Sequence, residues 1–342
     1  MLSGTSRHRL GPLPARRGTE ANQHPHPDHS RPLPPRLKPT DMEGVPAHGL
    51  EGHRPRTVLD APSNLGLAPP APGREPGTRR MPDVLRWNGL RARLGARDAG
   101  RVDPPRYRTE VHPCGIRNAE AIAAYARKVA DVVESIAFRQ ELAVVLGGDC
   151  SILLGNLLGA RRVVEKLGLV FLDGHSDFLT PERSGTHGAA GMDLALAVGR
   201  GPPLLSALAS EGPLVDASSV VHLGMREEDP ELRTSGIDVL DLAEIERRGP
   251  PSIAREVRER VDPLPGFWVH VDADVLDDTL MPAVDSRTPG GLSYEALVGL
   301  LRPLLASPSA IGVEFTIYDP DRDPEGTVGR AFTAALVEAL RP

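Results

Sequence analysis

The segment LVFLDGHSD, residues 169–177, joins four apolar residues directly to a run of polar ones. An apolar run without alternation is typical of a strand buried on both faces of a parallel sheet. Side chains alternate along an extended chain, so Asp173, His175 and Asp177 share one side of the backbone. Two carboxylates and an imidazole are suited to a divalent metal, although a solvated loop whose aspartates cap a helix would have the same composition.

The same pattern of apolar runs followed by Gly- or Asp-rich loops and helical stretches recurs from residue 57 onward. The predicted strands are 57–60, 142–147, 169–173, 220–224, 237–240, 267–272 and 311–314. The predicted helices are 81–94, 117–138, 151–166, 189–198, 251–261, 293–305 and 327–340. This alternation predicts an α/β protein with a mainly parallel sheet between helices, whose ligand site lies at the carboxyl ends of the strands.

The first 56 residues differ in composition from the rest of the chain. They hold 10 of the 35 prolines and 6 of the 11 histidines but no Ile, Phe, Tyr or Trp. Such a segment buries too little apolar surface to offset the entropy lost on ordering. We therefore expect a disordered tail over 1–56 and a single catalytic domain over 57–342.

Composition and charge narrow the classes of function. The 342 residues include only 2 cysteines, too few for a disulfide framework, and no apolar run long enough to cross a membrane. The formal net charge of −6 gives no reason to expect nucleic acid or an anionic membrane as a partner. We expect a cytoplasmic protein that acts on a small molecule.

A second acidic pair follows another apolar strand, in WVHVDADVLD, residues 268–277. Asp272 and Asp274 share one face, and two carboxylates at the end of a buried strand repel each other unless a cation lies between them. Together with the first cluster they provide four carboxylates and one imidazole, about what two metal ions with shared ligands require. His270 lies deeper in the apolar run, so we interpret it as a packed histidine rather than a ligand.

A third strand end reads VVLGGDCS, residues 144–151. The paired glycines permit a sharp turn close to a ligand, and Asp149 or Ser151 can cap the following helix. Cys150 lies at the start of that helix, where backbone N–H groups and the helix dipole lower the pKa of a thiol. Taken alone, this turn favours a buried, unreactive cysteine.

Six short motifs, taken in order, resemble those of the ureohydrolase family that includes arginase, agmatinase and formimidoylglutamase. They are GGDCS (147–151), DGHSD (173–177), SGTHG (184–188), DADVLD (272–277), PGGLS (289–293) and GVE (312–314). The resemblance covers residues 57–341. It implies a three-layer α/β/α fold, a binuclear manganese centre, hydrolysis of C–N bonds in guanidino or related compounds, and a homotrimer or homohexamer.

The resemblance also implies a set of metal ligands. They are Cys150, Asp173, His175, Asp177, Asp272 and Asp274. Asp173 and Asp272 would bridge the two ions. Asp177 would belong to one ion, and His175 and Asp274 to the other. Two cations that share one water lower its pKa enough to present hydroxide near neutral pH.

Three residues are implied in catalysis by the same resemblance. Asp177 would hold the proton of the hydroxide, and Glu314 would pair with the cationic head of the substrate. His187 occupies the place of a mobile histidine that carries a proton to the leaving amine, although a surface loop histidine beside Gly185 and Gly188 is the alternative.

The chain departs from the family pattern at two positions. The usual motif reads GGDHS, and its histidine ligates the first metal where this chain has Cys150. A thiolate favours softer ions, so we expect two divalent ions, Mn²⁺ first, with Zn²⁺, Fe²⁺, Co²⁺ or Ni²⁺ as alternatives. A branch of the family that cleaves hydroxyarginine also carries Cys here. Leu179 stands where arginases place an Asn that binds the substrate α-carboxylate, which argues against free arginine.

These observations support one main hypothesis and leave two alternatives. The main hypothesis is a metal-dependent hydrolase that cleaves a C–N bond of a guanidino or amidino substrate other than plain arginine. The first alternative, motivated by Cys150, is a non-catalytic protein of the same fold that binds a small ligand or partner. The second is a zinc amidohydrolase or deacetylase, which is disfavoured because a single metal would not require four carboxylates.

Overall fold

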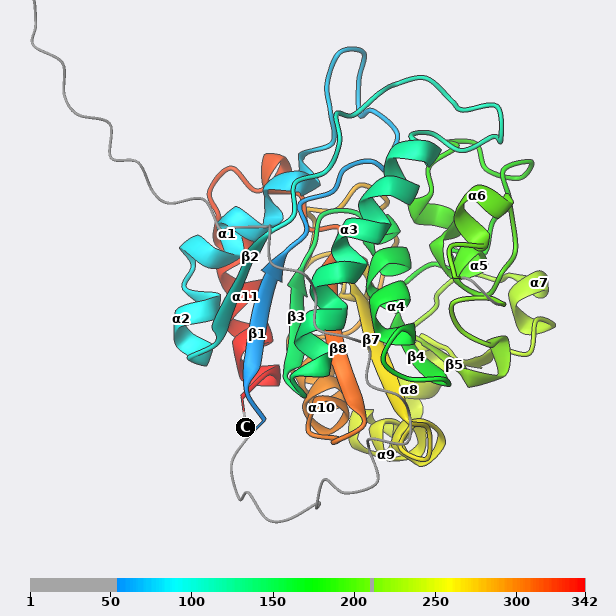
Figure 1. Cartoon of the computed structure of the whole chain (residues 1–342). Helices are drawn as coiled ribbons and strands as arrows, with labels where there is room; N and C mark the ends of the chain where they lie inside the picture. The colour runs from blue at the N-terminus through cyan, green and yellow to red at the C-terminus, as the bar shows by residue number, and fades with distance from the viewer. Residues whose placement is uncertain (1–53, 210–211, 342) are drawn as a thin grey trace, which may run out of the picture. The chain divides into compact units, whose positions relative to one another are not determined.

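The computed structural model describes residues 54–209 and 212–341, which build an eight-stranded sheet with helices on both faces (Figure 1). The strands are β1 (Arg56–Asp60), β2 (Arg97–Arg101), β3 (Leu142–Leu146), β4 (Leu167–Leu172), β5 (Val220–Leu223), β6 (Asp238–Leu240), β7 (Gly266–Asp272) and β8 (Ala310–Thr316). Their order is β2-β1-β3-β8-β7-β4-β5-β6, and every neighbouring pair is parallel.

Two layers of helices cover the sheet. One layer packs on the face that carries Phe171 and Trp268. It contains α3 (Ala119–Phe138), α4 (Leu153–Arg161), α5 (Asp193–Ala197), α6 (Pro203–Ser206) and α7 (Pro230–Arg233). The opposite layer contains α1 (Met81–Trp87), α2 (Leu90–Leu94), α8 (Leu242–Arg248), α9 (Pro250–Val261), α10 (Tyr294–Leu305) and α11 (Thr327–Ala339). The predicted three-layer α/β/α fold is confirmed.

The central strands are buried along their whole length, as their continuous apolar runs predict. Every residue of β3, β4, β7 and β8 is buried. On β7, Trp268 faces the α3 and α4 layer, whereas Val269 and Val271 face the opposite layer. Full burial of each such apolar side chain contributes about 1.5–3 kcal/mol, so the centre of the sheet is a rigid base for the strand ends.

All seven predicted strands are present, and β2 is an additional one. Its sequence, RDAGR, has no apolar run, and four of its five residues are exposed at the edge of the sheet. The strand forms because its backbone pairs with β1 rather than because its side chains are buried. Hydrophobic periodicity therefore carries no signal for it.

Several predicted helices are shorter than expected. The predicted helix 81–94 divides into α1 and α2 because Gly89 has a left-handed φ of 83°, which a continuous helix does not allow. The predicted helix 151–166 begins with a 3-10 turn, Cys150–Ile152, and ends at Arg161. The predicted helix 189–198 is likewise a 3-10 turn, Ala190–Met192, followed by α5. Sequence patterning did not predict the short helices α6, α7 and α8.

The predicted tail, 1–56, lies outside the described residues as far as residue 53. Its last residues belong to the folded unit, because β1 begins at Arg56. The guanidinium of Arg54 donates to the carbonyl oxygens of Gln140, at 2.8 Å, and Glu141, at 3.2 Å. The folded unit thus begins at least three residues before the predicted boundary at 57.

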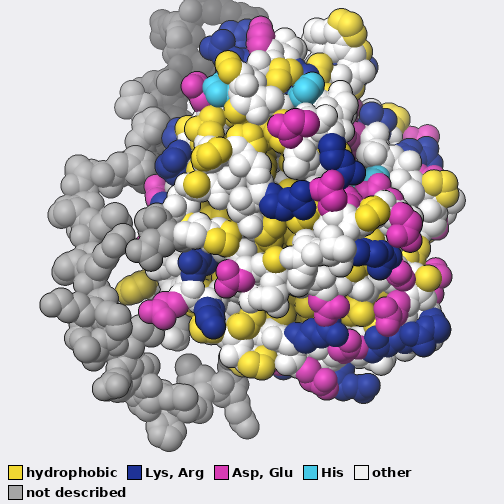
Figure 2. Space-filling model, turned by 90° about the vertical axis from the view of Figure 1, so that its right-hand side faces the viewer, with side chains coloured by type: hydrophobic (Ala, Val, Ile, Leu, Met, Phe, Trp, Pro, Cys, Tyr) yellow, Lys and Arg dark blue, Asp and Glu magenta, His cyan; other side chains and the backbone are white. Residues whose placement is uncertain are grey.

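The side of the sheet that carries β6 and α7 has arginine and acidic side chains interspersed over its surface (Figure 2). Ion pairs join Arg233 to Glu228 at 3.3 Å and Arg248 to Glu244 at 2.9 Å. Exposed pairs of this kind contribute about 0–1 kcal/mol each. Within 54–209 and 212–341, none of the helices has both the length and the apolar character required to cross a membrane.

Candidate metal centre

Four adjacent strands are followed by polar residues at their carboxyl ends, on one side of the sheet. The order β3-β8-β7-β4 makes these strands neighbours, so segments that are distant in sequence meet there. Cys150 follows β3, Asp173 follows β4, and Asp272 ends β7. The structure thus brings the three sequence clusters together.

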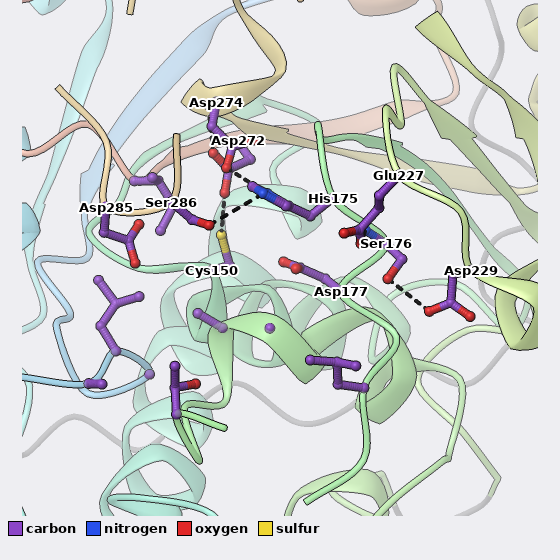
Figure 3. A pocket seen from close by; sticks show the side chains of 18 of the residues that line it. Cys150, His175, Ser176, Asp177, Glu227, Asp229, Asp272, Asp274, Asp285 and Ser286 are labelled. Carbon is purple, nitrogen blue, oxygen red and sulfur yellow. Dashed lines mark hydrogen bonds and ion pairs between the residues drawn. The ribbon is translucent and has the colours of Figure 1, made fainter. Parts of the chain in front are cut away.

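A cavity of about 330 Å³ opens at these strand ends (Figure 3). Its charged lining consists of the carboxylates Asp177, Glu227, Glu228, Asp229, Asp272, Asp274 and Asp285, together with His175 and Arg183. Apolar side chains, among them Leu67, Leu179 and Ile317, complete the wall. Because seven carboxylates face one guanidinium, the cavity attracts cations.

Asp173, His175 and Asp274 form a tight group in which one ligand atom of each lies within 4.8 Å of the others. His175 Nδ1 lies 2.9 Å from Asp274 Oδ2 and 3.7 Å from Asp173 Oδ1. Burial raises the pKa of Asp173 to about 7, and the charge of Asp274 adds to this. Burial lowers the pKa of His175, but the two carboxylates overcome that effect and raise it to about 11. A divalent cation can replace the proton that this imidazole otherwise holds.

Local hydrogen bonds fix the orientation of these carboxylates. Asp173 Oδ1 accepts from the backbone N–H of His175, and Asp272 Oδ1 accepts from the N–H of Asp274, each at 2.7 Å. Asp274 Oδ1 accepts from the N–H of Gly174 at 3.1 Å, which ties the loop after β7 to the loop after β4. In each loop the carboxylate of the first aspartate therefore accepts a hydrogen bond from the backbone N–H of the residue two positions later, which fixes the turn.

Outer contacts orient the ring of His175 as well. Its Nε2 lies 3.1 Å from the hydroxyl of Thr288 and 3.4 Å from that of Ser286, both on the loop that precedes α10. A metal-binding histidine commonly donates its second ring N–H to such a partner, which fixes the tautomer. Nδ1 is thereby left to face the two carboxylates.

Cys150 is almost fully buried in the wall of the cavity, and its thiol contacts two groups. Sγ donates to Asp272 Oδ2 at 3.0 Å (Figure 3). It also lies 3.2 Å from Thr316 Oγ1. Burial raises the pKa of the thiol well above its ordinary value, and the nearby charges of Asp272 and Asp193 add to this. The prediction of a thiol pKa lowered by the helix start is therefore wrong, because burial among carboxylates outweighs the helix dipole.

Several buried polar atoms at this edge have no hydrogen-bond partner among the described residues. Among them are Asp173 Oδ2, Asp193 Oδ2 and His270 Nε2. A buried polar atom left unpaired costs about 1–3 kcal/mol, and a buried charge costs more. Cations in contact with these atoms would remove that cost, so the donors present fit metal ions.

Five of the six predicted ligands fall into groups of three that could hold a metal. The groups are Asp173–His175–Asp274, Asp173–His270–Asp272 and Cys150–Asp193–His270. Asp177 lines the same cavity, at a left-handed φ of 44°, but belongs to no such group among residues 54–209 and 212–341. Its pKa is raised by burial and by neighbouring carboxylates.

Glu314 does not line the cavity, although we expected it to bind the substrate. It is fully buried within β8, where Oε1 lies 2.6 Å from His270 Nδ1 and Oε2 accepts from Asn156 Nδ2. At the end of β8 the cavity is instead lined by Ile317. The structure therefore gives no support to the expected pairing of Glu314 with the substrate, because its carboxylate lies below the strand ends and is bonded there.

His187 lies on the loop beside the cavity, with a left-handed φ of 56°. Its Nδ1 lies 3.0 Å from the carbonyl oxygen of Gly115, and its backbone N–H donates to Ser184 Oγ. The cavity wall is formed by the preceding residue, Thr186, rather than by the imidazole. A role in proton transfer would require the ring to leave Gly115.

Sequence analysis missed several residues of the site. Asp193 is fully buried in α5, and its only signal in the sequence is a carboxylate within the apolar stretch 192–198. Glu227 accepts from the backbone N–H of Ser176 at 2.7 Å, and Asp229 accepts from the Ser176 hydroxyl at 3.0 Å. The run of acids at 227–229 has the composition of a solvated turn, although its position after the predicted strand 220–224 is on the side where the ligand site is expected.

Comparison with known proteins agrees with this geometry. The model of the Arginase family matches residues 70–340, which is most of the chain. The chain belongs to the arginase family. Arginase of Bacillus caldovelox is 29% identical to it over 303 residues, which cover 84% of this chain and 96% of the relative.

Solved structures of arginase-family proteins share the fold. Native Bacillus caldovelox arginase superposes with a TM-score of 0.76 at 26% identity, covering 84% of this chain and 98% of that one. Proclavaminate amidino hydrolase from Streptomyces clavuligerus has a TM-score of 0.64 at 21% identity, covering 84% and 90%, and this likeness shows the fold alone. Sequence and fold thus both place the chain in the arginase family.

The departures from the arginase-family pattern all lie in or beneath the cavity. Cys150 replaces the family histidine and contacts Asp272. Leu179, in place of the asparagine, lines the cavity, as does Ile317. Arg183 also reaches it but is paired with Glu231 at 2.6 Å. The two positions at which the sequence departs from the resembled motifs, 150 and 179, thus both line the cavity.

Proposed function

We propose that this protein is a metal-dependent hydrolase that cleaves a C–N bond of a guanidino or amidino compound other than plain arginine. The observation that carries the proposal is the group Asp173, His175 and Asp274, placed with Asp272 at an acidic cavity that His175, Asp272 and Asp274 line. Such a cavity favours a cationic ligand, and guanidinium and amidinium groups are cations at neutral pH.

Two divalent ions are proposed as cofactors, Mn²⁺ first and Zn²⁺, Fe²⁺, Co²⁺ or Ni²⁺ as alternatives. The proposed ligands are Cys150, Asp173, His175, Asp177, Asp272 and Asp274. When bound, such ions lower the pKa of a shared water so that hydroxide forms near neutral pH. The carboxylates balance the charge of the ions, and the local hydrogen bonds of Asp173 and Asp272 hold them in place.

The cavity wall supports a substrate with a cationic head group. It offers no hydrogen bond at position 179, where arginases bind the α-carboxylate of their substrate. Leu179 and Ile317 offer no hydrogen bond. The carboxylates of Glu227 and Asp229, fixed by Ser176, present negative charge on another wall. We propose that these acids, rather than Glu314, attract and orient the cationic group.

Proton transfer is proposed for two residues. Asp177 would accept a hydrogen bond from the attacking group and pass its proton toward the leaving amine as the C–N bond breaks, because its carboxylate faces the cavity. His187 would deliver a proton to the leaving amine once its ring turns from Gly115 toward the cavity.

The cytoplasmic location and the homotrimer or homohexamer that the family resemblance implies are also proposals.

The test is hydrolysis by the full chain. Protein stripped of metal is reconstituted separately with Mn²⁺, Fe²⁺, Co²⁺, Ni²⁺ and Zn²⁺ and offered arginine, hydroxyarginine, agmatine and other guanidino or amidino compounds. We expect release of urea, a substituted urea or an amine from at least one compound other than arginine.

Two matched variants give the assay its controls. Asp274→Asn removes a proposed ligand, so hydrolysis is expected to fall by two or more orders of magnitude. Asp277→Asn changes a partly exposed carboxylate on the same loop, which accepts a hydrogen bond from the Thr279 backbone N–H, and activity is expected to persist. Absence of product with every metal and every substrate would refute the proposed activity.

A further inference from the structure

Three fully buried residues meet next to the cavity, and one of them, Cys150, lines it. Cys150, Asp193 and His270 each offer a ligand atom, and these atoms lie within 4.8 Å of one another. Their side chains are at most 1% exposed. The family resemblance implies a ligand role for Cys150 but none for Asp193 or His270.

His270 is held in the orientation of a metal ligand. Nδ1 lies 2.6 Å from Glu314 Oε1, and Asn156 donates to the other oxygen of that carboxylate. Phe171 stacks on the imidazole, with ring centroids 4.4 Å apart and planes 11° from parallel. Nε2 has no partner among the described residues. A carboxylate that fixes one ring nitrogen while the other is free is the usual arrangement behind a metal-bound histidine.

Asp193 presents a second unpartnered atom to the same place. Its Oδ1 accepts from the backbone N–H of Leu194 at 2.7 Å, whereas Oδ2 is buried without a partner. A buried carboxylate without a counter-charge costs several kcal/mol when ionised. A cation beside Cys150 would offset that cost.

The group is continuous with the proposed metal centre. The His270 imidazole also lies within 4.8 Å of carboxylate oxygens of Asp173 and Asp272. Cys150 Sγ is 3.0 Å from Asp272 Oδ2. A cation held by the buried group would therefore be a neighbour of the proposed bridging carboxylates.

We propose that Cys150, Asp193 and His270 bind one divalent cation. The loop after β3 has Cys150 where the resembled motif has a histidine, and His270 on β7 would supply an imidazole to the ion instead. This inference rests on the proposed metal centre and specifies its composition. Sulfur and nitrogen donors select Zn²⁺, Fe²⁺ or Co²⁺ over Mn²⁺, whereas the oxygen-rich group Asp173, His175 and Asp274 suits Mn²⁺. The centre would then hold two unlike ions.

Cobalt binding to the metal-free full chain tests the site without reliance on activity. Co²⁺ bound to a thiolate gives a charge-transfer absorption that carboxylate and imidazole ligands do not give. We expect this band to saturate at one equivalent per chain in the wild type. Cys150→Ser should abolish it, and Cys114→Ser, at the other cysteine, should leave it unchanged.

Three further variants test the new ligands and the residue that positions one of them. Asp193→Asn and His270→Gln should each weaken Co²⁺ binding in the thiolate site by about 10-fold or more, and shift its ligand-field spectrum. Glu314→Gln should weaken binding by about 10–100-fold, the usual effect of losing a partner behind a ligand. His222→Gln is the matched control, because His222 is also buried beside Phe171 but bonds the backbone carbonyl of His175 through Nε2.

The outcomes separate the site from the proposed reaction. Cobalt binding without a thiolate band, or an unchanged spectrum and affinity in both folded variants Asp193→Asn and His270→Gln, would overturn the inference. Circular dichroism and thermal unfolding identify any variant that fails to fold. If the ligand variants fail to fold, the thiolate band of the wild type and the Co²⁺ affinity of Glu314→Gln test the inference. A thiolate band in a chain that hydrolyses no compound would keep the metal site and refute the activity instead.

Discussion

The thiol of Cys150 donates a hydrogen bond to Asp272 Oδ2 across 3.0 Å, in a place that is closed to solvent. A proton thus occupies the position between two groups that are both proposed to hold metal. Occupation of this site by a cation requires that proton to leave.

Metal affinity should therefore fall as the pH falls. Burial and the charge of Asp274 raise the pKa of Asp173 to about 7, so this carboxyl binds a proton below that pH and a cation must displace it. We expect affinity to drop progressively from pH 8 to pH 6, measured by competition with a chromophoric chelator. Affinity that is independent of pH over this range would contradict the coupling.

Cys150→His should change the metal preference of the chain. An imidazole is a harder donor than a thiolate, so the variant should bind Mn²⁺ more tightly relative to Zn²⁺ than the wild type does, by about 10-fold or more. Metal content after equilibration with equal concentrations of both ions measures the ratio. An unchanged ratio would mean that residue 150 does not touch the ion.

Leu179→Asn should improve the use of arginine. The amide would supply the hydrogen bond to an α-carboxylate that Leu179, on the cavity wall, does not. A hydrogen bond to a charged group contributes about 1.5–3 kcal/mol, so kcat/KM for arginine should rise about 10-fold or more. Leu179→Ala, which opens the same space without a donor, is the control and should give no such gain.

Glu314→Gln should affect metal loading and not the affinity for substrate. Glu314 bonds His270 and Asn156 beneath the cavity, so the variant should lose activity at limiting metal and recover part of it with excess metal. KM should stay within about 3-fold of the wild type under saturating metal. A large rise in KM would instead restore the role in substrate binding that the sequence predicted.

Arg54→Ala should destabilise the folded unit. The guanidinium donates to the carbonyl oxygens of Gln140 and Glu141 and so ties the entry to β1 to the start of β3. Its loss should lower the free energy of unfolding by about 1–3 kcal/mol in urea denaturation. Arg79→Ala, at an exposed arginine paired only with Glu75, should change it by less than about 0.5 kcal/mol.

The sequence predicted the core of the sheet well because continuous apolar runs are sufficient to define buried parallel strands. It failed for β2, whose residues are polar and whose formation depends on pairing with β1. The acids at the ends of β4 and β7 were predictable because alternation over three residues places them on one side. Local patterns of this kind need no knowledge of the fold.

The roles of Glu314, His270 and Asp193 could not be predicted in the same way. Glu314 pairs in register with His270, two residues before the end of each strand, so both side chains lie below the edge where ligands bind. Asp193 reaches the same place from a helix about 80 residues earlier than His270. Contacts between such distant segments depend on the strand order, which periodicity does not reveal.

The exposed strand β2 has a consequence for assembly. An edge strand offers free backbone N–H and C=O groups to any other chain, and charged side chains along it oppose such pairing. In β2 the charges are Arg97, Asp98 and Arg101, of which Arg97 pairs with Glu141 and Asp98 with Arg86. Pairing of another sheet onto β2 would have to disrupt these ion pairs, so the charged side chains of β2 oppose growth of the sheet from this edge.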